Sequence, residues 1–111
     1  GAMILLVKRL RKINGDAAFI ATSYINGEFG LSADEDFTGS LCKVYEARGI
    51  KIAANEVGIS ANLLSKENAA LLHVRKNEAS LEVTFLAKNS AGKVVEYTQE
   101  VFRKDIFDFK L

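Results

Sequence analysis

The stretch ILLVKRLRKINGDAAFIATSYI, residues 4–25, decides the fold. Two runs rich in Ile, Leu, Val and Phe flank the pair Asn14-Gly15. Both residues of this pair accept a positive φ, which the tightest hairpin turns require. The stretch therefore predicts a β-hairpin in which residues 4–13 and 17–25 form the two strands.

The rest of the chain alternates between helix and strand patterns. Residues 38–49 predict a helix of about three turns, with apolar residues at helical spacing and Gly49 where a C-cap belongs. Further patterns predict strands at 51–62, at 79–88 and from 94 onward, and a short helix at 65–74 that Ser65 caps. The order β-β-α-β-α-β-β indicates an α+β fold, an antiparallel β-sheet with helices packed on one side.

The last strand has two different faces, because alternate residues of a strand point the same way. Its odd positions are mostly apolar and are expected in the core: Val95, Tyr97, Gln99 and Val101. Its even positions are polar and end in an aromatic ring: Glu96, Thr98, Glu100 and Phe102. This even face is either solvated or the wall of a pocket. The preceding strand should turn one set of residues to the core: Leu81, Val83, Phe85 and Ala87.

Composition narrows the class of protein. The 111 residues carry 15 Lys and Arg against 14 Asp and Glu, a net charge of +1, which argues against a dedicated nucleic-acid binder. The single cysteine, Cys42, permits no internal disulfide and favours a reducing compartment. No apolar run approaches the ~20 residues that cross a bilayer, so we expect a cytoplasmic protein without membrane contact. Gly1-Ala2-Met3 resembles a remnant of tag cleavage, which leaves residues 4–111 as the domain.

Arg9 and Arg11 are the first candidate site residues. On a strand they share one face at a spacing of about 7 Å. Two guanidinium groups at that spacing can converge on one phosphate or carboxylate. The alternative is a basic edge strand that resists aggregation, and taken alone the pattern favours this alternative.

The sequence TGSL at the start of the predicted helix is a second candidate, because hydroxyl groups and unpaired backbone N–H groups bind anions there. Thr38 and Ser40 carry those hydroxyls, and an ordinary N-cap is the alternative for both. Glu96 is the third candidate and could accept hydrogen bonds from a polyol or an amine. Its alternative is a solvated strand face.

Two other reactive side chains, those of His73 and Cys42, indicate neither a metal site nor a catalytic site. His73 stands at the end of a short helix with no metal ligand at a suitable spacing, so it reads as a C-terminal cation. Cys42 has no basic partner in sequence and reads as a packing residue. We expect no catalytic residue, no metal and no cofactor, because no nucleophile–base pair and no Gly-rich phosphate loop is visible.

Three segments together resemble a known family: residues 7–25 (VKRLRKINGDAAFIATSYI), 39–74 (GSLCKVYEARGIKIAANEVGISANLLSKENAALLHV) and 92–111 (GKVVEYTQEVFRKDIFDFKL). They resemble the UTRA domain, the effector-binding half of HutC-type regulators in the GntR superfamily. The most specific part is the ending, VEY followed by an aromatic, Arg, Asp and an aromatic-rich strand. The resemblance implies the fold of chorismate lyase and an N-terminal truncation, with no DNA-binding winged helix-turn-helix in this chain.

The resemblance also implies a binding site. In members that sense phosphorylated sugars, the arginines and the helix-start hydroxyls hold the phosphate, and the Glu of VEY and an aromatic contact the sugar. By position these residues are Arg9, Arg11, Thr38, Ser40, Glu96 and Phe102. Two positions depart from the family pattern. Family members often have Tyr at the position of Phe102 and Glu at the position of Ala21. The anion half of the site is thus retained and the half that chooses the sugar is altered.

The leading hypothesis is an effector-sensing and dimerisation domain of a bacterial transcription regulator. Its partners would be a small anion such as a sugar phosphate, a second copy of the chain, and operator DNA through the missing winged helix. One alternative is an enzyme resembling chorismate lyase, although a shared fold is weak ground for a function. The other is a dimerisation module with no ligand.

Overall fold

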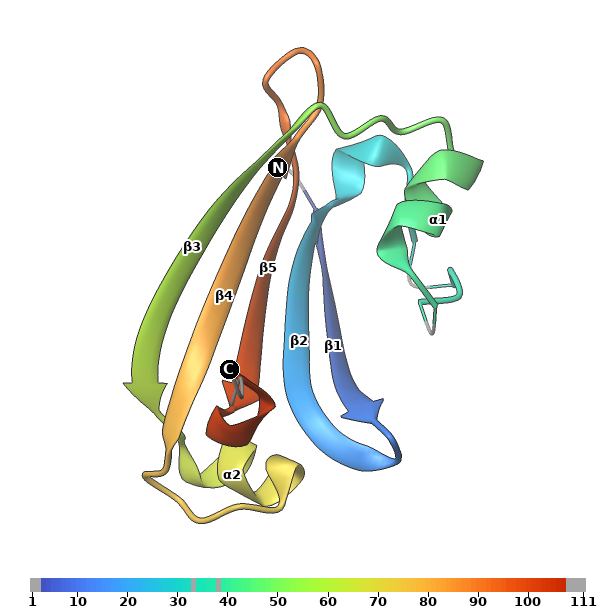
Figure 1. Ribbon diagram of the computed structural model, residues 1–111. Helices are drawn as coiled ribbons and strands as arrows, with labels where there is room; N and C mark the ends of the chain where they lie inside the picture. The colour runs from blue at the N-terminus through green and yellow to red at the C-terminus, as the bar shows by residue number, and fades with distance from the viewer. Residues whose placement is uncertain (1–2, 33, 38, 108–111) are drawn as a thin grey trace.

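The computed structural model describes residues 3–32, 34–37 and 39–107, and Figure 1 shows the course of the chain. The strands are β1 (Ile4–Ile13), β2 (Asp16–Asn26), β3 (Ala54–Leu63), β4 (Ala79–Lys88) and β5 (Val94–Arg103). The helices are α1 (Leu41–Ala47) and α2 (Lys66–Leu72), and two 3-10 turns are added, η1 (Gly27–Phe29) and η2 (Lys104–Phe107). The predicted order of strands and helices is confirmed.

The predicted hairpin forms between β1 and β2. Asn14 and Gly15 have φ values of 53° and 85°, so both turn positions are left-handed, as the sequence required. The register runs from Ile4 opposite Asn26 to Ile13 opposite Asp16, with one irregularity between Arg11 and Lys12. The hairpin thereby places the arginine-bearing strand at an edge of the sheet.

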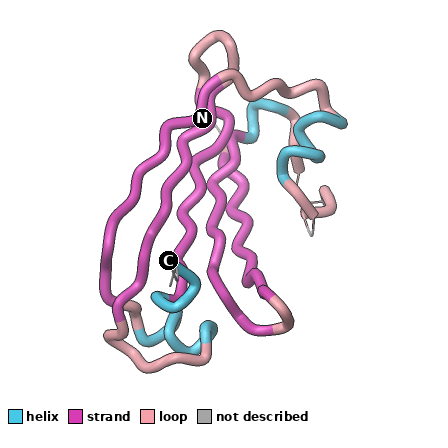
Figure 2. Tube along the Cα trace, viewed as in Figure 1, coloured by secondary structure: helices cyan, strands magenta, loops and turns pink. Residues whose placement is uncertain are grey.

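One antiparallel sheet contains all five strands in the order β1-β2-β5-β4-β3. The last strand, β5, lies in the middle and pairs with both β2 and β4, and the continuous run of strands is visible in Figure 2. The α+β class with an antiparallel sheet is confirmed. The central position of β5 brings its side chains near both arms of the sheet.

The two helices pack on opposite faces of the sheet, so the expectation that helices lie on one side is wrong in this detail. Residues of α2 form a buried cluster with Ile20 and Val101. Residues of α1 form another with Ile25. Ile20 and Ile25 are an odd number of residues apart on β2, so they point to opposite faces. Helical periodicity shows that one side of a helix is buried, but not which face of the sheet covers it.

The face that α1 shares with the even residues of β5 is only partly covered. Every residue of β3 is exposed. On β4 the expected core face is buried only at Ala87, while Leu81, Val83 and Phe85 are half-buried. The prediction for β4 is therefore correct for one residue of four, because the described helices leave the rest of this face open.

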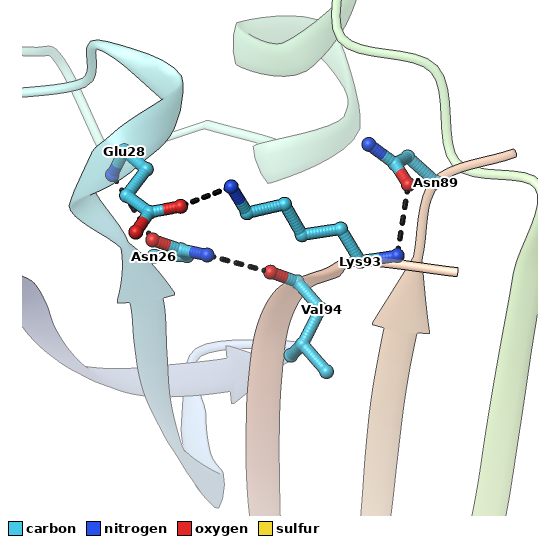
Figure 3. A network of polar contacts seen from close by, with 5 residues as sticks. All are labelled: Asn26, Glu28, Asn89, Lys93 and Val94. Carbon is cyan, nitrogen blue, oxygen red and sulfur yellow. Dashed lines mark hydrogen bonds and ion pairs between the residues drawn. The ribbon is translucent and has the colours of Figure 1, made fainter. Parts of the chain in front are cut away.

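A polar network ties the β4–β5 turn to the segment after β2 (Figure 3). Lys93 forms an ion pair with Glu28 of η1. Asn26 Nδ2 donates to the Val94 carbonyl at 2.9 Å, and the Lys93 backbone N–H donates to Asn89 Oδ1 at 3.0 Å. The network fixes the direction in which the chain leaves β2 toward α1.

Both helices are short. The helix α1 has seven residues, about two turns and not the three expected. Gly49 follows it with a φ of 72°, as its assignment to the helix end required. At α2 the Ser65 side chain accepts a hydrogen bond from the Asn68 N–H at 3.1 Å, which confirms the predicted cap, and His73 ends the helix. Within the described ranges no helix is long and apolar enough to cross a membrane.

Candidate functional site

Arg9 and Arg11 point to the same face of β1 and converge on one oxygen. Arg9 Nη1 and Arg11 Nη2 each donate a hydrogen bond of 3.1 Å to the Gly39 carbonyl. The two guanidinium groups thus meet at one acceptor, which in this structure is a neutral backbone group of the protein, and their convergence on an anion stays a prediction. Because Gly39 immediately precedes Ser40, the arginines reach the start of α1.

The start of α1 differs from an ordinary helix N-terminus. Ser40 is the N-cap residue, yet its side chain makes no capping hydrogen bond. Its hydroxyl is therefore not used by the helix. A helix of seven residues adds little dipole of its own, so any preference for an anion must come from the arginines. The other predicted hydroxyl, on Thr38, lies outside the described residues.

A pocket of about 160 Å³ lies where β1, the start of α1 and the sheet meet. Its lining comes from five elements: Arg9, Ser40, Leu41, Cys42, Asn55, Phe85, Glu96, Thr98 and Glu100. Three of the predicted site residues, Arg9, Ser40 and Glu96, are thus brought together although they are far apart in sequence. Three of the four even residues of β5 line this pocket: Glu96, Thr98 and Glu100.

A chain of hydrogen bonds holds the Glu96 carboxylate. Thr98 Oγ1 donates to Glu96 Oε2 at 2.7 Å. Its oxygen lies 2.8 Å from Ser23 Oγ inside the protein. A hydroxyl has one hydrogen, so the Thr98 hydroxyl that donates to Glu96 must accept from Ser23. The carboxylate is therefore oriented before any ligand arrives, and one of its oxygens, Oε1, is left for other partners.

Tyr45 of α1 brings a second polar group to Glu96. The residue is 1% exposed, and its hydroxyl has no hydrogen-bond partner of good geometry among the described residues. Burial, and then the negative charge of Glu96, raise the pKa of the Tyr45 hydroxyl far above its ordinary value. The group therefore stays protonated and neutral.

The two charges on opposite walls of the pocket are both poorly compensated. Burial and the neighbouring charge of Arg11 lower the pKa of Arg9, and the Arg9 Nε atom is buried without a partner among the described residues. Burial raises the pKa of Glu100 although Arg9 and Arg11 act in the opposite direction. Each charged form is thus disfavoured by its surroundings.

Glu100 also lines the pocket, although the sequence did not single it out as a site residue. In the sheet register Ala21 stands opposite Arg9 on one side and opposite Glu100 on the other. The Ala21 methyl is buried and leaves room above it. Periodicity alone placed Glu100 on the correct face but not under α1. Asn55 and Thr98 were missed as lining residues for the same reason.

Phe102 and Arg11 lie on the predicted face but do not line this pocket. Phe102 stacks on Phe19 of β2, with ring centroids 4.5 Å apart and an angle of 24° between the planes. Arg11 lines an adjacent groove of about 470 Å³ along β1, which Arg9 also borders, together with Glu35, Asp36 and Phe37. The groove is an open edge of the sheet, whereas the pocket gathers side chains from five elements.

Cys42 also lines the pocket and is exposed, so its interpretation as a packing residue is wrong. No set of three or more His, Cys, Asp or Glu residues that could hold a metal ion occurs in the part of the chain that the structure describes. The polar side chains at the pocket are those of Arg9, Ser40, Cys42, Asn55, Glu96, Thr98 and Glu100. Such a set can bind a small polar ligand through charges and hydrogen bonds.

Comparisons with known proteins agree with this architecture. No curated protein matches the chain. The fold is shared with a GntR-family transcriptional regulator from Enterococcus faecalis V583, at 25% identity and a TM-score of 0.85 over 97% of this chain and 79% of that one. It is also shared with the effector domain of PhnF from Mycobacterium smegmatis, at 20% identity and a TM-score of 0.85 over 92% of this chain and 64% of that one.

The structure of PhnF from the same organism gives 19% identity and a TM-score of 0.86, and the chain covers 48% of its length while 96% of the chain is matched. The chain therefore spans about half the length of that regulator. The family model of the UTRA domain matches residues 1–108. The chain belongs to the UTRA domain family.

Proposed function

We propose that this chain is the effector-sensing domain of a GntR-type transcription regulator and that its effector is a small phosphorylated or carboxylated metabolite. The observation that carries the proposal is the pocket in which Arg9, Ser40 and Glu96 meet. Membership of the UTRA family and the fold shared with regulators support it. HutC-type membership belongs to the same proposal.

The arginine pair supports an anionic ligand. Both guanidinium groups are held by the single Gly39 carbonyl. A phosphate or carboxylate offers a guanidinium an opposite charge and two acceptor oxygens, which a single neutral carbonyl does not, so such an anion would displace this carbonyl. Arg9 and Ser40 would hold the anion and Glu96 the polar body of the ligand. Arg11, Phe102 and Thr38 would complete the site.

Displacement of Gly39 offers a route from binding to regulation. The Gly39 carbonyl lies one residue before the N-cap of α1, so a ligand that takes its place would alter the position of this helix. A ligand that favours one arrangement of α1 shifts the population toward it. In a homodimer the shift would change the spacing of two winged helix-turn-helix domains on operator DNA in the cytoplasm. Light scattering of the chain in solution checks the dimer.

The alternative of a chorismate lyase-like enzyme gains no specific observation from the pocket. The similar structure from Enterococcus faecalis is of a GntR-family transcriptional regulator and that from Mycobacterium smegmatis is of an effector domain, which favours a role in regulation. Incubation with chorismate and an assay for 4-hydroxybenzoate distinguishes the two functions. A dimerisation module with no ligand is distinguished by the binding experiment below.

A thermal-shift screen against sugar phosphates, phosphonates and small carboxylates tests the proposal. A ligand at one hundred times its Kd should add about 2.7 kcal/mol to the free energy of unfolding. We expect an anion to raise the melting temperature of the chain and Arg9→Ala to abolish the rise. Arg75→Ala is the matched control, because Arg75 is exposed beyond α2 on the other face of the sheet. If no anion raises the melting temperature, or if the rise survives in Arg9→Ala, the proposal is wrong.

A further inference from the structure

The pocket holds charges of both signs on separate walls. Arg9 stands on β1, while Glu96 and Glu100 stand on β5. In the register Arg9 and Glu100 are two strand spacings apart, about 10 Å between Cα atoms, with the buried Ala21 methyl between them. Long side chains of opposite charge thus border one small cavity, and yet no ion pair joins Glu100 to any residue that the structure describes.

We propose that the effector is a zwitterion, with an anionic group at Arg9 and a protonated amine at the wall formed by Glu96 and Glu100. The inference rests on the proposed function and narrows the class of ligand. It assigns Glu100 a binding role, as the contact of the amine. The chemistry is that of an amino phosphate, an amino phosphonate or an amino acid.

Charge balance favours a zwitterion over a simple anion. The charged residues that line the pocket are Arg9, Glu96 and Glu100, so one positive charge faces two negative charges. A ligand that carried only a phosphate would leave both carboxylates beside its negative charge, which costs free energy in a partly desolvated site. A ligand with one charge of each sign adds no net charge and gives each wall an opposite partner.

The donors and acceptors that remain available at the pocket also favour a zwitterion. Glu100 makes no hydrogen bond with any described residue, and Glu96 uses only Oε2, with Thr98. The Tyr45 hydroxyl is buried beside Glu96 and makes no hydrogen bond of good geometry within the described residues. An ammonium group has three donors and no acceptor, so it matches two carboxylates and a hydroxyl oxygen. On the opposite wall the unpaired Arg9 Nε is a donor, which matches the anionic group.

The pKa shifts of Glu100 and Arg9 agree with a cation site on one wall of the pocket and an anion site on the other. The pKa of Glu100 is raised by burial even though two arginines are near, so the carboxylate lacks a cation. The pKa of Arg9 is lowered by burial and by Arg11, which together outweigh the opposite effect of Glu96 and Glu100. If the two walls neutralised each other, each pKa would shift in the other direction.

Isothermal titration of the 111-residue chain with three probes tests the inference. The probes are O-phosphoethanolamine, ethyl phosphate, which lacks the amine, and ethylamine, which lacks the phosphate. We expect O-phosphoethanolamine to bind at least about tenfold more tightly than ethyl phosphate, a difference typical of one added charged contact. Glu100→Gln should remove that advantage. Glu67→Gln, which deletes an exposed carboxylate on α2 across the sheet, should keep it.

Each other outcome overturns a different statement. If ethyl phosphate binds as tightly as O-phosphoethanolamine and Arg9→Ala abolishes both, the zwitterion is wrong and anion sensing stands. If the preference for the amine survives in Glu100→Gln, the role of Glu100 is wrong. If O-phosphoethanolamine does not bind at millimolar concentration, the inference is overturned, whereas the proposed function is decided separately by the thermal-shift screen of anions. The comparison of probes on the unaltered chain does not depend on the folding of any variant.

Discussion

The two helices of this domain have seven residues each but differ in how their polar side chains are used. At α2 the buried cluster is entirely aliphatic and the Ser65 cap is satisfied. At α1 the Ser40 side chain makes no capping hydrogen bond, and the buried Tyr45 hydroxyl has no well-aligned partner among the residues that the structure describes. The α2 end therefore uses its side chains for stability, whereas the α1 end keeps polar groups available beside a pocket. Natural domains give up local consistency in this way at binding sites.

The largest effect that tests this comparison is expected at the α2 cluster. Leu72 is fully buried there, so Leu72→Ala should lower the free energy of unfolding by about 3 kcal/mol through lost burial and a residual cavity. Leu71→Ala, at the more exposed neighbour, should cost only about 0.5 kcal/mol. Urea denaturation measures both. A loss below about 1 kcal/mol in Leu72→Ala would show that α2 is not the stabilising end.

A smaller effect separates the two caps. Ser65→Ala removes a capping hydrogen bond and should destabilise the chain by about 1 kcal/mol. Ser40→Ala removes no such bond and should change stability by less than about 0.5 kcal/mol. Thermal denaturation of the two variants measures the difference. Equal losses would mean that Ser40 caps its helix in solution, and the contrast between the helices would fail.

The smallest effect is a pH dependence at the pocket. The pKa of Glu100 is raised above its ordinary value of 4.5, so the folded state holds this proton more tightly than the unfolded state. Stability should then fall as the pH rises from about 4.5 through the raised pKa, which is opposite to the usual behaviour of a carboxyl group. Glu100→Gln should remove this part of the decline. Melting temperatures between pH 4 and pH 8, compared with those of Glu67→Gln, check the sign.

Much of the fold could be predicted because its signals are local. Asn14-Gly15 fixed the hairpin, Ser65 fixed the start of a helix, and the alternation in β5 placed Glu96 on one face. Each of these depends on residues that are neighbours along the chain, where backbone conformation and side-chain direction are set. The convergence of Arg9 and Arg11 followed from the same strand geometry.

The features that the sequence did not predict all depend on contacts between segments that are far apart along the chain. Alternation put Glu100 on the correct face but could not show that the start of α1 borders the same pocket, so its place there was not foreseen. Tyr45 has the helical spacing of a core residue and is buried. That its hydroxyl lies beside Glu96 depends on how α1 packs against β5, which helical spacing does not show. Phe102 stacks on Phe19 because β2 and β5 pair in one register. No local pattern contains that pairing.

The sequence by itself determined which segments are strands and helices, and it determined that the arginines of β1 share a face. Backbone sterics and the period of two along a strand act within a few residues, so they can be read from the chain. Only the tertiary structure decided that β5 lies at the centre of the sheet, that α1 and α2 cover opposite faces, and that Arg9 and Glu100 border one cavity. Those outcomes depend on the packing of segments far apart in sequence, where burial of apolar surface selects among arrangements that local rules allow equally.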